Sequence, residues 1–312
     1  MVFGRFVGEL SRAELEQFFY LDEADLERIA EHRGDHNRLG FALQVGTVRF
    51  LGAFLSDSLD VPWSVVDYLA AQLGIADPSV IKRYPERVAT PNAHAREIRR
   101  LYAYGDFTGA AVEDLSGFVY SRAWTHGEGP TVLFTHAVAW LRRRRVLLPG
   151  VTRLSKTVRA ARESAVSELY ELLAEAAKAA DPQLPGRLRG LLAVDEGARG
   201  SRLEVLRAGP VRLSGPAMNQ ALGRVEQIRA LGIGMVDTSQ VPVSRLRALA
   251  RYGLEAKAQL LRRLAEPRRT ATLLATLDTL SAAGSEWQGN LMRSAPKDDA
   301  YQQCCWWEDH TS

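Results

Sequence analysis

The sequence lacks separated cysteines and long apolar runs. Among 312 residues only two cysteines occur, Cys304 and Cys305, and they are adjacent. A disulfide framework needs spaced pairs, so this arrangement indicates a reducing compartment. Charged residues Arg5 and Glu9 interrupt any signal-peptide core near the N-terminus. No apolar run approaches the roughly 18 residues that a membrane-spanning helix requires. We therefore expect a cytosolic protein with no membrane partner.

Groups of residues with catalytic or metal-binding spacing are also scarce. His32 and His36 stand four residues apart, but Gly34 interrupts the helix that would bring them together, and no third ligand is evident. We expect them to contribute packing or phosphate contacts instead. The acidic pair Asp195-Glu196 stands alone, and two carboxylates without further context make neither an acid–base system nor a metal site. The sequence thus predicts no catalytic residue, no cofactor, no metal and no small-molecule substrate.

The charge is distributed unevenly along the chain. Residues 1–60 hold 6 Lys/Arg against 11 Asp/Glu, whereas residues 138–189 hold 11 against 5 and residues 202–269 hold 13 against 5. An acidic front followed by two basic blocks indicates a polyanionic partner. The plainer interpretation, a set of solvated basic helix faces, stays open for any single helix.

Helical periodicity dominates, and no alternating strand pattern appears, so we predict an all-α fold of two or three small helical domains. Ser11 followed by Glu14 forms a capping-box pattern for a first helix. Asp22 begins a second helix that ends at Gly34, and Asp35 begins a third. Further helices are expected at 131–146, 155–177, 184–193, 201–206, 217–231 and 244–265, with a Gly-rich break near 105–117.

The region after residue 60 has a succession of short segments that is typical of a helix-turn-helix unit. Ser64 begins a helix that ends at Gly74, a short helix follows at 78–84, and a third begins near Thr90. Four polar residues share one face of the third helix, namely Asn92, Arg96, Arg99 and Arg100. This face predicts either a reader of DNA grooves and phosphates or a solvated basic surface, and the periodicity does not choose between them.

Four consecutive arginines, Arg142 to Arg145, end a helix before Pro149 and Gly150. They point around most of a helical turn and have no acidic residue near them in the sequence. Concentrated guanidinium groups suit phosphate contacts. Cations also complement the dipole at a helix C-terminus, but one or two arginines would satisfy that role. The run of four therefore favours a nucleic-acid partner.

Several long segments, in order, resemble the N-terminal region of the Tn-three family of replicative transposases. They include YLDEADLERIAEHRGDHNRLGFALQVGTVRF at 20–50, RRRRVLLPGVTRLSKTVRAAR at 142–162, LLAVDEGARGSRLEVLR at 191–207, RVEQIRALGI at 224–233 and VPVSRLRALARYGLEAKAQLLRRLAEPRRTATLLATL at 241–277. The resemblance covers about residues 5–278. It implies helical domains that recognise the terminal inverted repeats of a transposon, and an RNase H-like catalytic part that lies elsewhere in the family.

The resemblance ends abruptly. The segment EWQGNLMRSAPKDDAYQQCCWWEDHTS is not similar to the family and shows no periodicity, and we interpret it as the product of a frameshift or early stop and as largely disordered. The expected organisation is a helical domain with a helix-turn-helix-like unit at 1–105, a second domain with the basic helix at 117–207, a helical segment at 214–280 and a disordered tail at 281–312.

The resemblance predicts a DNA-binding fragment without catalytic activity, which pairs with double-stranded transposon ends and associates with the nucleoid when bound. The alternative is a helical interaction protein that pairs with itself or with intact transposase and regulates it. The predicted DNA contacts are Arg38, Asn92, Arg96, Arg99, Arg100, Arg142, Arg143, Arg144, Arg145, Arg153, Lys156, Arg159, Arg247 and Arg251.

Overall fold

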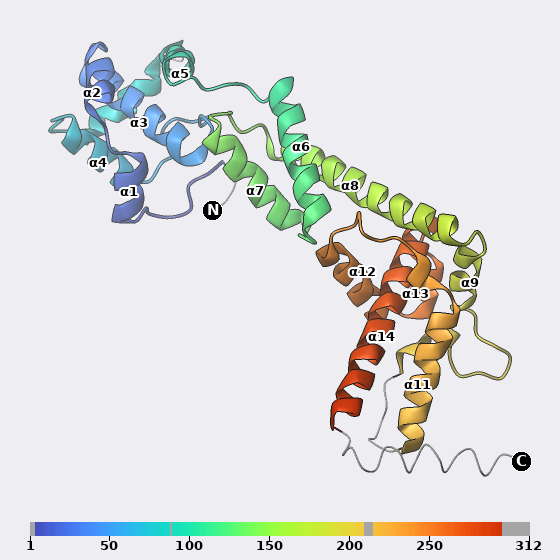
Figure 1. Ribbon diagram of the computed structural model, residues 1–312. Coiled ribbons are helices and arrows are strands. Elements are labelled where there is room, and N and C mark those ends of the chain that lie inside the picture. The colour runs from blue at the N-terminus through green and yellow to red at the C-terminus, as the bar shows by residue number, and fades with distance from the viewer. Residues whose placement is uncertain (1–3, 88, 209–214, 295–312) are drawn as a thin grey trace, which may run out of the picture. The chain divides into compact units, whose positions relative to one another are not determined.

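The computed structural model describes residues 4–87, 89–208 and 215–294, with side chains between 219 and 282 in the last range. Within these ranges the chain is helical and forms no strand (Figure 1), which confirms the all-α prediction. Two isolated bridges, Gly105 with Val146 and Val194 with Ser201, are the extended pairings seen there. None of the helices in these ranges has both the length and the apolar content needed to span a membrane.

The chain divides into two compact units, residues 1–122 with 128–162, and residues 123–127 with 163–312. The first unit contains α1 (Arg12–Phe18), α2 (Glu23–Ala30), α3 (Asp35–Leu51), α4 (Trp63–Gln72), the 3₁₀ helix η1 (Pro78–Glu86), α5 (Ala89–Leu101), most of α6 (Ala110–Thr125), α7 (Pro130–Arg143) and the start of α8 (Val151–Ala180). The predicted capping box at Ser11–Glu14 is present, and the structure adds a second one at Asp22–Asp25, at the predicted start of the second helix.

Helix α3 is the centre of the first unit, because α1, α2, α4, η1 and α5 all pack against it (Figure 1). Every residue from Leu39 to Val48 is buried, so this helix has no solvated side there. Two glycines allow the close approach of large rings. A Cβ on Gly40 would lie 2.2 Å from the Tyr84 ring, and one on Gly46 would lie 2.2 Å from the Phe19 ring. The GFALQVG segment is thus a packing sequence, in which small residues admit aromatic side chains from neighbouring elements.

Helix α6 corrects the sequence prediction of a Gly-rich break near 105–117. The helix begins just after Gly109, which has a φ of +48°, and continues through Gly117. Gly117 is exposed, and the interior of the helix buries Leu115 and Val119 instead. A glycine inside a helix costs only about 1 kcal/mol relative to alanine, which this burial outweighs.

The second unit holds the rest of α8, α9 (Leu184–Gly190), α10 (Arg202–Arg207), α11 (Gly215–Ala230), η2 (Ile233–Met235), α12 (Val243–Glu255), α13 (Ala258–Arg262) and α14 (Glu266–Ser294). Its core gathers leucines and alanines of α8, α9, α12 and α14. Gly253 allows α12 to approach α14 closely, because a Cβ there would lie 1.8 Å from Oγ1 of Thr276.

Two predictions for this unit were wrong. The single helix expected at 244–265 is broken, since Ala256 and Lys257 are extended, with ψ of 138° and 143°. The break shifts the phase of the pattern. A continuous helix would place Leu260 on the same face as the buried Leu249, whereas Leu260 is 49% exposed. In addition, helix α14 continues to Ser294, although the sequence from 281 shows no periodicity. The vicinal cysteines Cys304 and Cys305 lie outside the described residues.

Candidate nucleic-acid interface

The helix-turn-helix-like segment consists of α4, η1 and α5. Its middle element is a 3₁₀ helix because Asp77 caps it, accepting from the amide of Ser79 at 2.9 Å, and Pro85 stands inside it. A buried hydrogen-bond chain fixes α5 to this framework. Nε2 of Gln44 donates to Oη of Tyr84 at 2.8 Å, and this hydroxyl lies 2.9 Å from Nδ1 of His94. The chain sets which face of α5 is buried.

Helix α5 buries His94 and Ile98 and presents the opposite face to solvent. Asn92, Arg96 and Arg100 are exposed on that face, as the spacing predicted. Nε of Arg96 donates only to the carbonyl of Asn92 in its own helix, at 3.3 Å. Arg99 instead forms an ion pair with Asp106 of the following loop. The α5 face therefore carries exposed guanidinium groups, one of which is paired.

The loops that follow α5 and α7 lie side by side. The amide of Gly105 donates to the carbonyl of Arg145 at 2.9 Å, and the amide of Leu147 donates to the carbonyl of Gly105 at 2.9 Å. Nη1 of Arg145 also donates to the carbonyl of Tyr102 at 3.1 Å. Because of these bonds, the C-terminal end of α5, with Arg99 and Arg100, lies beside the arginine run at the end of α7. More than 40 residues separate the two in the sequence.

The four arginines of the run have different environments. Arg142 points into the unit: its Nη2 donates to the carbonyl of Arg49 at 3.1 Å, and its guanidinium lies 5.4 Å from the centre of the Phe18 ring. Burial lowers the pKa of Arg142. Arg143 is exposed and has no hydrogen bond or ion pair within the described part of the chain. The run is thus one structural arginine followed by exposed ones.

The remaining two arginines are exposed but partly engaged. Arg144 stacks on the Trp140 ring, 4.4 Å from its centre, and lies 3.4 Å from Oδ2 of Asp114. Acidic residues are therefore near the cluster in space, which corrects the expectation drawn from their absence nearby in the sequence. Arg145 adopts a φ of +54°, a left-handed conformation that costs a residue with a Cβ about 1 kcal/mol.

The first turns of α8 add further cations beside these loops. The guanidinium of Arg153 lies 5.3 Å from the centre of the Phe107 ring, two residues beyond Gly105. Lys156 and Arg159 are exposed on the following turns. We call the set Arg99, Arg100, Arg143, Arg144, Arg145, Arg153 and Lys156 the basic cluster.

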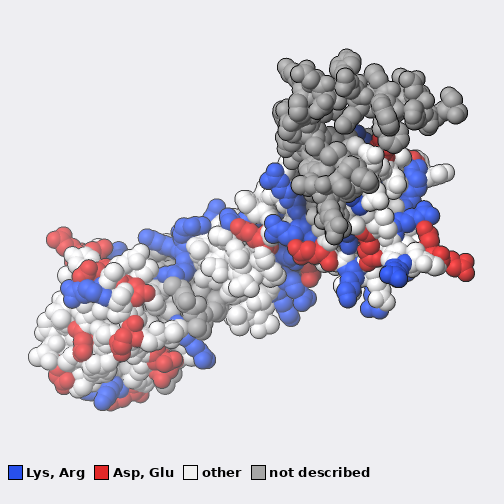
Figure 2. Space-filling view, turned by 90° about the horizontal axis from the view of Figure 1, so that it is seen from below, with Lys and Arg blue, Asp and Glu red and all other residues white. Residues whose placement is uncertain are grey.

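The electrostatics of the cluster favour an anion. Tyr104 lies among arginines: burial raises the pKa of its hydroxyl, while Arg49, Arg145 and Arg142 oppose that rise. Two carboxylates, Asp106 and Asp114, offset the charge of the cluster's seven cations. On the face shown in Figure 2, acidic side chains are scattered over the α1–α5 end of the first unit, and basic side chains gather beside them toward α6 and α7. The excess of cations leaves a surface suited to phosphate groups.

Other predicted contact residues lie elsewhere. Arg38 is half-buried on α3 and lies 3.3 Å from Oδ1 of Asp35. Arg247 and Arg251 are exposed on α12 of the second unit. His32 packs against the rings of Phe41 and His94, with centroids 4.3 Å and 4.4 Å apart, as the packing interpretation proposed. In the described ranges no three His, Cys, Asp or Glu residues are grouped to hold a metal ion.

Sequence reasoning missed two features of this surface. Lys82, Arg83 and Arg87 are exposed on and just after η1, and the stretch IKRYPER would have indicated them. The aromatic rings under Arg144 and Arg153 gave no such signal, because Trp140 and Phe107 come from positions whose periodicity indicates only core packing.

The chain matches one family model and several known proteins. Residues 2–161 match the family described as "Domain of unknown function (DUF4158)". The chain is 40% identical over 281 residues to the transposase for transposon gamma-delta of Escherichia coli (strain K12), covering 88% of the chain and 27% of that protein. It is 27% identical over 258 residues to the transposase for transposon Tn1546 of Enterococcus faecium, covering 82% and 26%. An 83-residue segment is 57% identical to the transposase for transposon Tn4556 of Streptomyces fradiae. The chain spans about a quarter of the length of the first two relatives.

Proposed function

Since the chain belongs to the DUF4158 family and matches transposases of the Tn-three family along most of its length, we propose that it binds double-stranded DNA at transposon ends. In this proposal the chain supplies recognition during transposition, and strand cleavage and joining belong to the remaining three quarters of its relatives. The observation that carries the proposal is the basic cluster, assembled from α5, α7 and α8 by the pairing of two distant loops.

Affinity comes mainly from the exposed cations of the cluster. Arg143, Arg100 and Lys156 have no ion pair within the described residues, so no ion pair of that part of the chain has to break when they bind phosphate. Each phosphate contact releases counterions, and binding therefore weakens as salt rises. The guanidinium groups of Arg144 and Arg153 lie over aromatic rings, and these contacts limit their motion and lower the entropic cost of binding. Arg142 is left out of the proposed interface because it binds the α3 backbone.

Sequence preference is proposed to come from the exposed face of α5. Asn92 and Arg96 are side chains that recognise base edges in the major groove, Asn at adenine and Arg at guanine. Among the described residues the Arg96 guanidinium bonds to one backbone carbonyl of its own helix, and breaking this single bond lets it turn toward a base. Replacing Arg96 with Ala should reduce binding to a transposon-end duplex more than binding to a shuffled duplex, by about 1–3 kcal/mol for each base-edge hydrogen-bond pair that the substitution removes.

The test compares Arg143→Ala with Arg12→Ala. Both substitutions remove one exposed cation, but Arg12 pairs with Glu16 on α1 and is not part of the cluster. Fluorescence anisotropy should show weaker binding of Arg143→Ala to specific and shuffled duplexes alike, with a salt slope reduced by about one unit. Arg12→Ala should bind like the original chain. Equal affinity and salt slope for both variants would remove the cluster from the interface.

The regulatory alternative has its own supporting observation in the second unit. A pocket of 360 Å³ is lined by Leu191, Val205, Leu206 and Leu231, and Val205 is 58% exposed. An apolar surface of this kind suits contact with another protein chain. Mixing the chain with intact transposase and measuring co-elution, with Val205→Asp as the variant, distinguishes this role from DNA recognition.

A further inference from the structure

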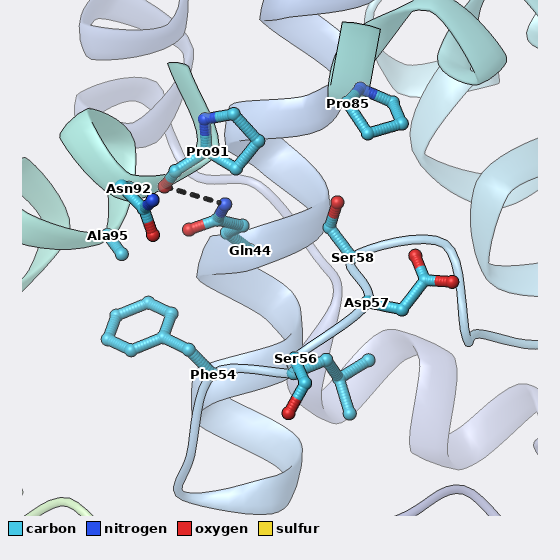
Figure 3. A pocket seen from close by; sticks show the side chains of 10 residues that line it. Gln44, Phe54, Ser56, Asp57, Ser58, Pro85, Pro91, Asn92 and Ala95 are labelled. Carbon is cyan, nitrogen blue, oxygen red and sulfur yellow. Dashed lines mark hydrogen bonds between the residues drawn. The ribbon is translucent and has the colours of Figure 1, made fainter. Parts of the chain in front are cut away.

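A second pocket, in the first unit, opens beside the exposed face of α5. Its volume is 280 Å³, and it lies between α3, the 54–58 loop, the end of η1 and the first turns of α5 (Figure 3). The lining includes Gln44, Phe54, Asp57, Pro85, Asn92 and Ala95. The size is at the lower limit of ligand pockets, about 300 Å³, and suits one ring system rather than an extended ligand.

The amide of Gln44 gives this pocket an unused hydrogen-bond acceptor. The Gln44 side chain is more than nine-tenths buried, and its Oε1 has no hydrogen-bond partner within the described residues. Its orientation is determined by Pro91, whose carbonyl can only accept and lies 3.1 Å from Nε2. Figure 3 shows the dashed bond that joins the nitrogen to that carbonyl, and the oxygen lies on the side of Ala95. Oε1 is therefore the atom that stays unpaired. It is buried behind the pocket lining, so a partner in the pocket reaches it only after a small shift of the Gln44 side chain.

The hydrogen-bond chain behind Gln44 reinforces this orientation. Nε2 also donates to Oη of Tyr84, which leaves the hydroxyl hydrogen of Tyr84 for Nδ1 of His94. Burial and the neighbouring His32 lower the pKa of His94 to about 4, so its ring is neutral and has one nitrogen that accepts. Both donors of the Gln44 amide are consumed on this side. An N–H group that enters the pocket would satisfy Oε1, which otherwise stays a buried, unpaired acceptor.

We propose that this pocket receives one unpaired nucleobase, whose exocyclic amino group donates to Oε1 of Gln44 and whose ring lies against Phe54. The inference rests on the proposed function, because the neighbouring side chains of Arg96 and Arg100 belong to the proposed DNA surface. A base outside the duplex stack needs an aromatic or apolar wall and a polar group for its pairing edge, and the pocket has both. Adenine, guanine and cytosine carry an amino group, whereas thymine does not.

A cationic protein side chain is the competing occupant, because Asp57 lies on the rim. The Asp57 carboxylate is partly used, since its Oδ1 accepts from the amide of Leu59 at 2.9 Å. Arg96, one turn beyond Asn92 on α5, places a positive charge near the same rim and disfavours a second cation. A neutral base with amino donors meets no like charge there and leaves the bond between Asp57 and Leu59 in place.

The experiment uses the full chain and three duplexes that differ at one position: fully paired, with one bulged adenine, or with an abasic residue in place of that adenine. Anisotropy titrations should show the bulged-adenine duplex binding on the order of tenfold more tightly than the abasic one, the effect of one stacked base. With 2-aminopurine as the bulged base, its fluorescence should change on binding.

Two variants fill or strip the pocket, and one serves as control. Ala95→Leu places a larger side chain in the pocket, and Phe54→Ala removes the ring. Ala13→Leu adds the same side chain at an exposed position of α1, outside the proposed DNA surface. The preference for the bulged adenine should disappear in the first two variants and persist in Ala13→Leu, while binding of the fully paired duplex stays the same in all three.

The outcomes separate the two proposals. If no duplex binds, the proposed function fails and this inference fails with it. If duplexes bind in a salt-dependent way but the bulged adenine gives no advantage, or gives the same advantage in Ala95→Leu and Phe54→Ala, only the nucleobase pocket is overturned. A rise in melting temperature with N-acetylarginine amide that Ala95→Leu abolishes, without a preference for the bulged adenine, would assign the pocket to a protein cation instead.

Discussion

Asp25 of α2 and Arg49 of α3 form an ion pair at 2.8 Å although only 1% of the Asp25 side chain is exposed. Oδ1 of Asp25 also accepts from the hydroxyl of Tyr102 at 2.6 Å, just after α5. Burial alone would raise the pKa of this carboxyl, but the bonds from Arg49 and Tyr102 outweigh it and lower the pKa. One carboxylate thus joins α2, α3 and the end of the helix that carries the proposed base contacts.

The ion pair leads to a stability prediction. Replacing Asp25 with Asn should leave Arg49 as an uncompensated, partly buried charge and lower the free energy of unfolding by about 3 kcal/mol. Chemical denaturation followed by circular dichroism measures this change. Glu16→Gln, which removes an exposed pair with Arg12, is the control and should leave the curve in place. A shift of similar size in both variants would contradict a special role for the buried pair.

The contact between Gly40 and Tyr84 gives a second prediction. In Gly40→Ala the new Cβ would overlap the Tyr84 ring, so α3 and η1 must separate, at about 1–3 kcal/mol. Gly117→Ala on α6 is the matched control, because its Cβ would meet no atom within 4 Å. That substitution should stabilise the protein by about 0.5–1 kcal/mol through helix propensity. Thermal melts of the two variants should therefore move in opposite directions.

Burial of His94 predicts a pH dependence between about pH 4 and 6.5. The folded protein keeps this imidazole neutral down to a pKa of about 4, whereas the unfolded chain binds a proton near 6.5. The unfolded state therefore binds more protons in this window, and stability falls as the pH falls, by on the order of 3 kcal/mol. Protonation of Asp25 also lowers the stability as the pH falls, but only at pH values below the ordinary pKa of a carboxyl group, because the pKa of Asp25 is lowered in the folded state. Denaturation at a series of pH values should show that the loss of stability between about pH 6.5 and 4 disappears in His94→Gln. If the loss persists in this variant, another group causes it.

Substitutions of the adjacent Arg142 and Arg143 at the end of α7 should have different effects on stability and on DNA binding. Arg142→Ala removes the hydrogen bond to the Arg49 carbonyl and the contact with Phe18, so it should lower stability by about 1–3 kcal/mol. Arg143→Ala removes no bond that the described residues form and should leave the melting temperature unchanged. Melting curves and DNA titrations of the two variants, measured together, test whether the run divides into a structural residue and a binding residue.

Local signals in the sequence predicted the helices of the first unit well. The Ser11–Glu14 and Asp22–Asp25 caps are side-chain bonds within one turn, and the chain needs no distant partner to form them. Helix α6 and the break at Ala256 were missed because tertiary packing decides them. Burial of Leu115 and Val119 keeps a helix through Gly117, and extended backbone at Ala256 and Lys257 separates α12 from α13.

The candidate site was predictable by residue type and not by arrangement. The spacing of Asn92, Arg96 and Arg100 on one helix was enough to place them on one exposed face. No pattern indicated that Arg145 would bind the carbonyl of Tyr102, because that bond depends on the pairing of two loops that are far apart in the sequence. The same holds for Arg142, whose burial follows from the position of α1 and α3. The boundaries of the functional domains stay a prediction.

The left-handed backbone of Arg145 has a consequence for protein engineering. A glycine would adopt this φ of +54° without a Cβ penalty, so a design method that scores backbone strain would choose Gly or Asn at position 145. Such a variant would lose the φ penalty, but it would also lose the hydrogen bond from Arg145 to the Tyr102 carbonyl and one guanidinium of the basic cluster. Under the proposed function, a design that scores only backbone strain at this position would remove one phosphate contact and would therefore select chains with weaker DNA binding.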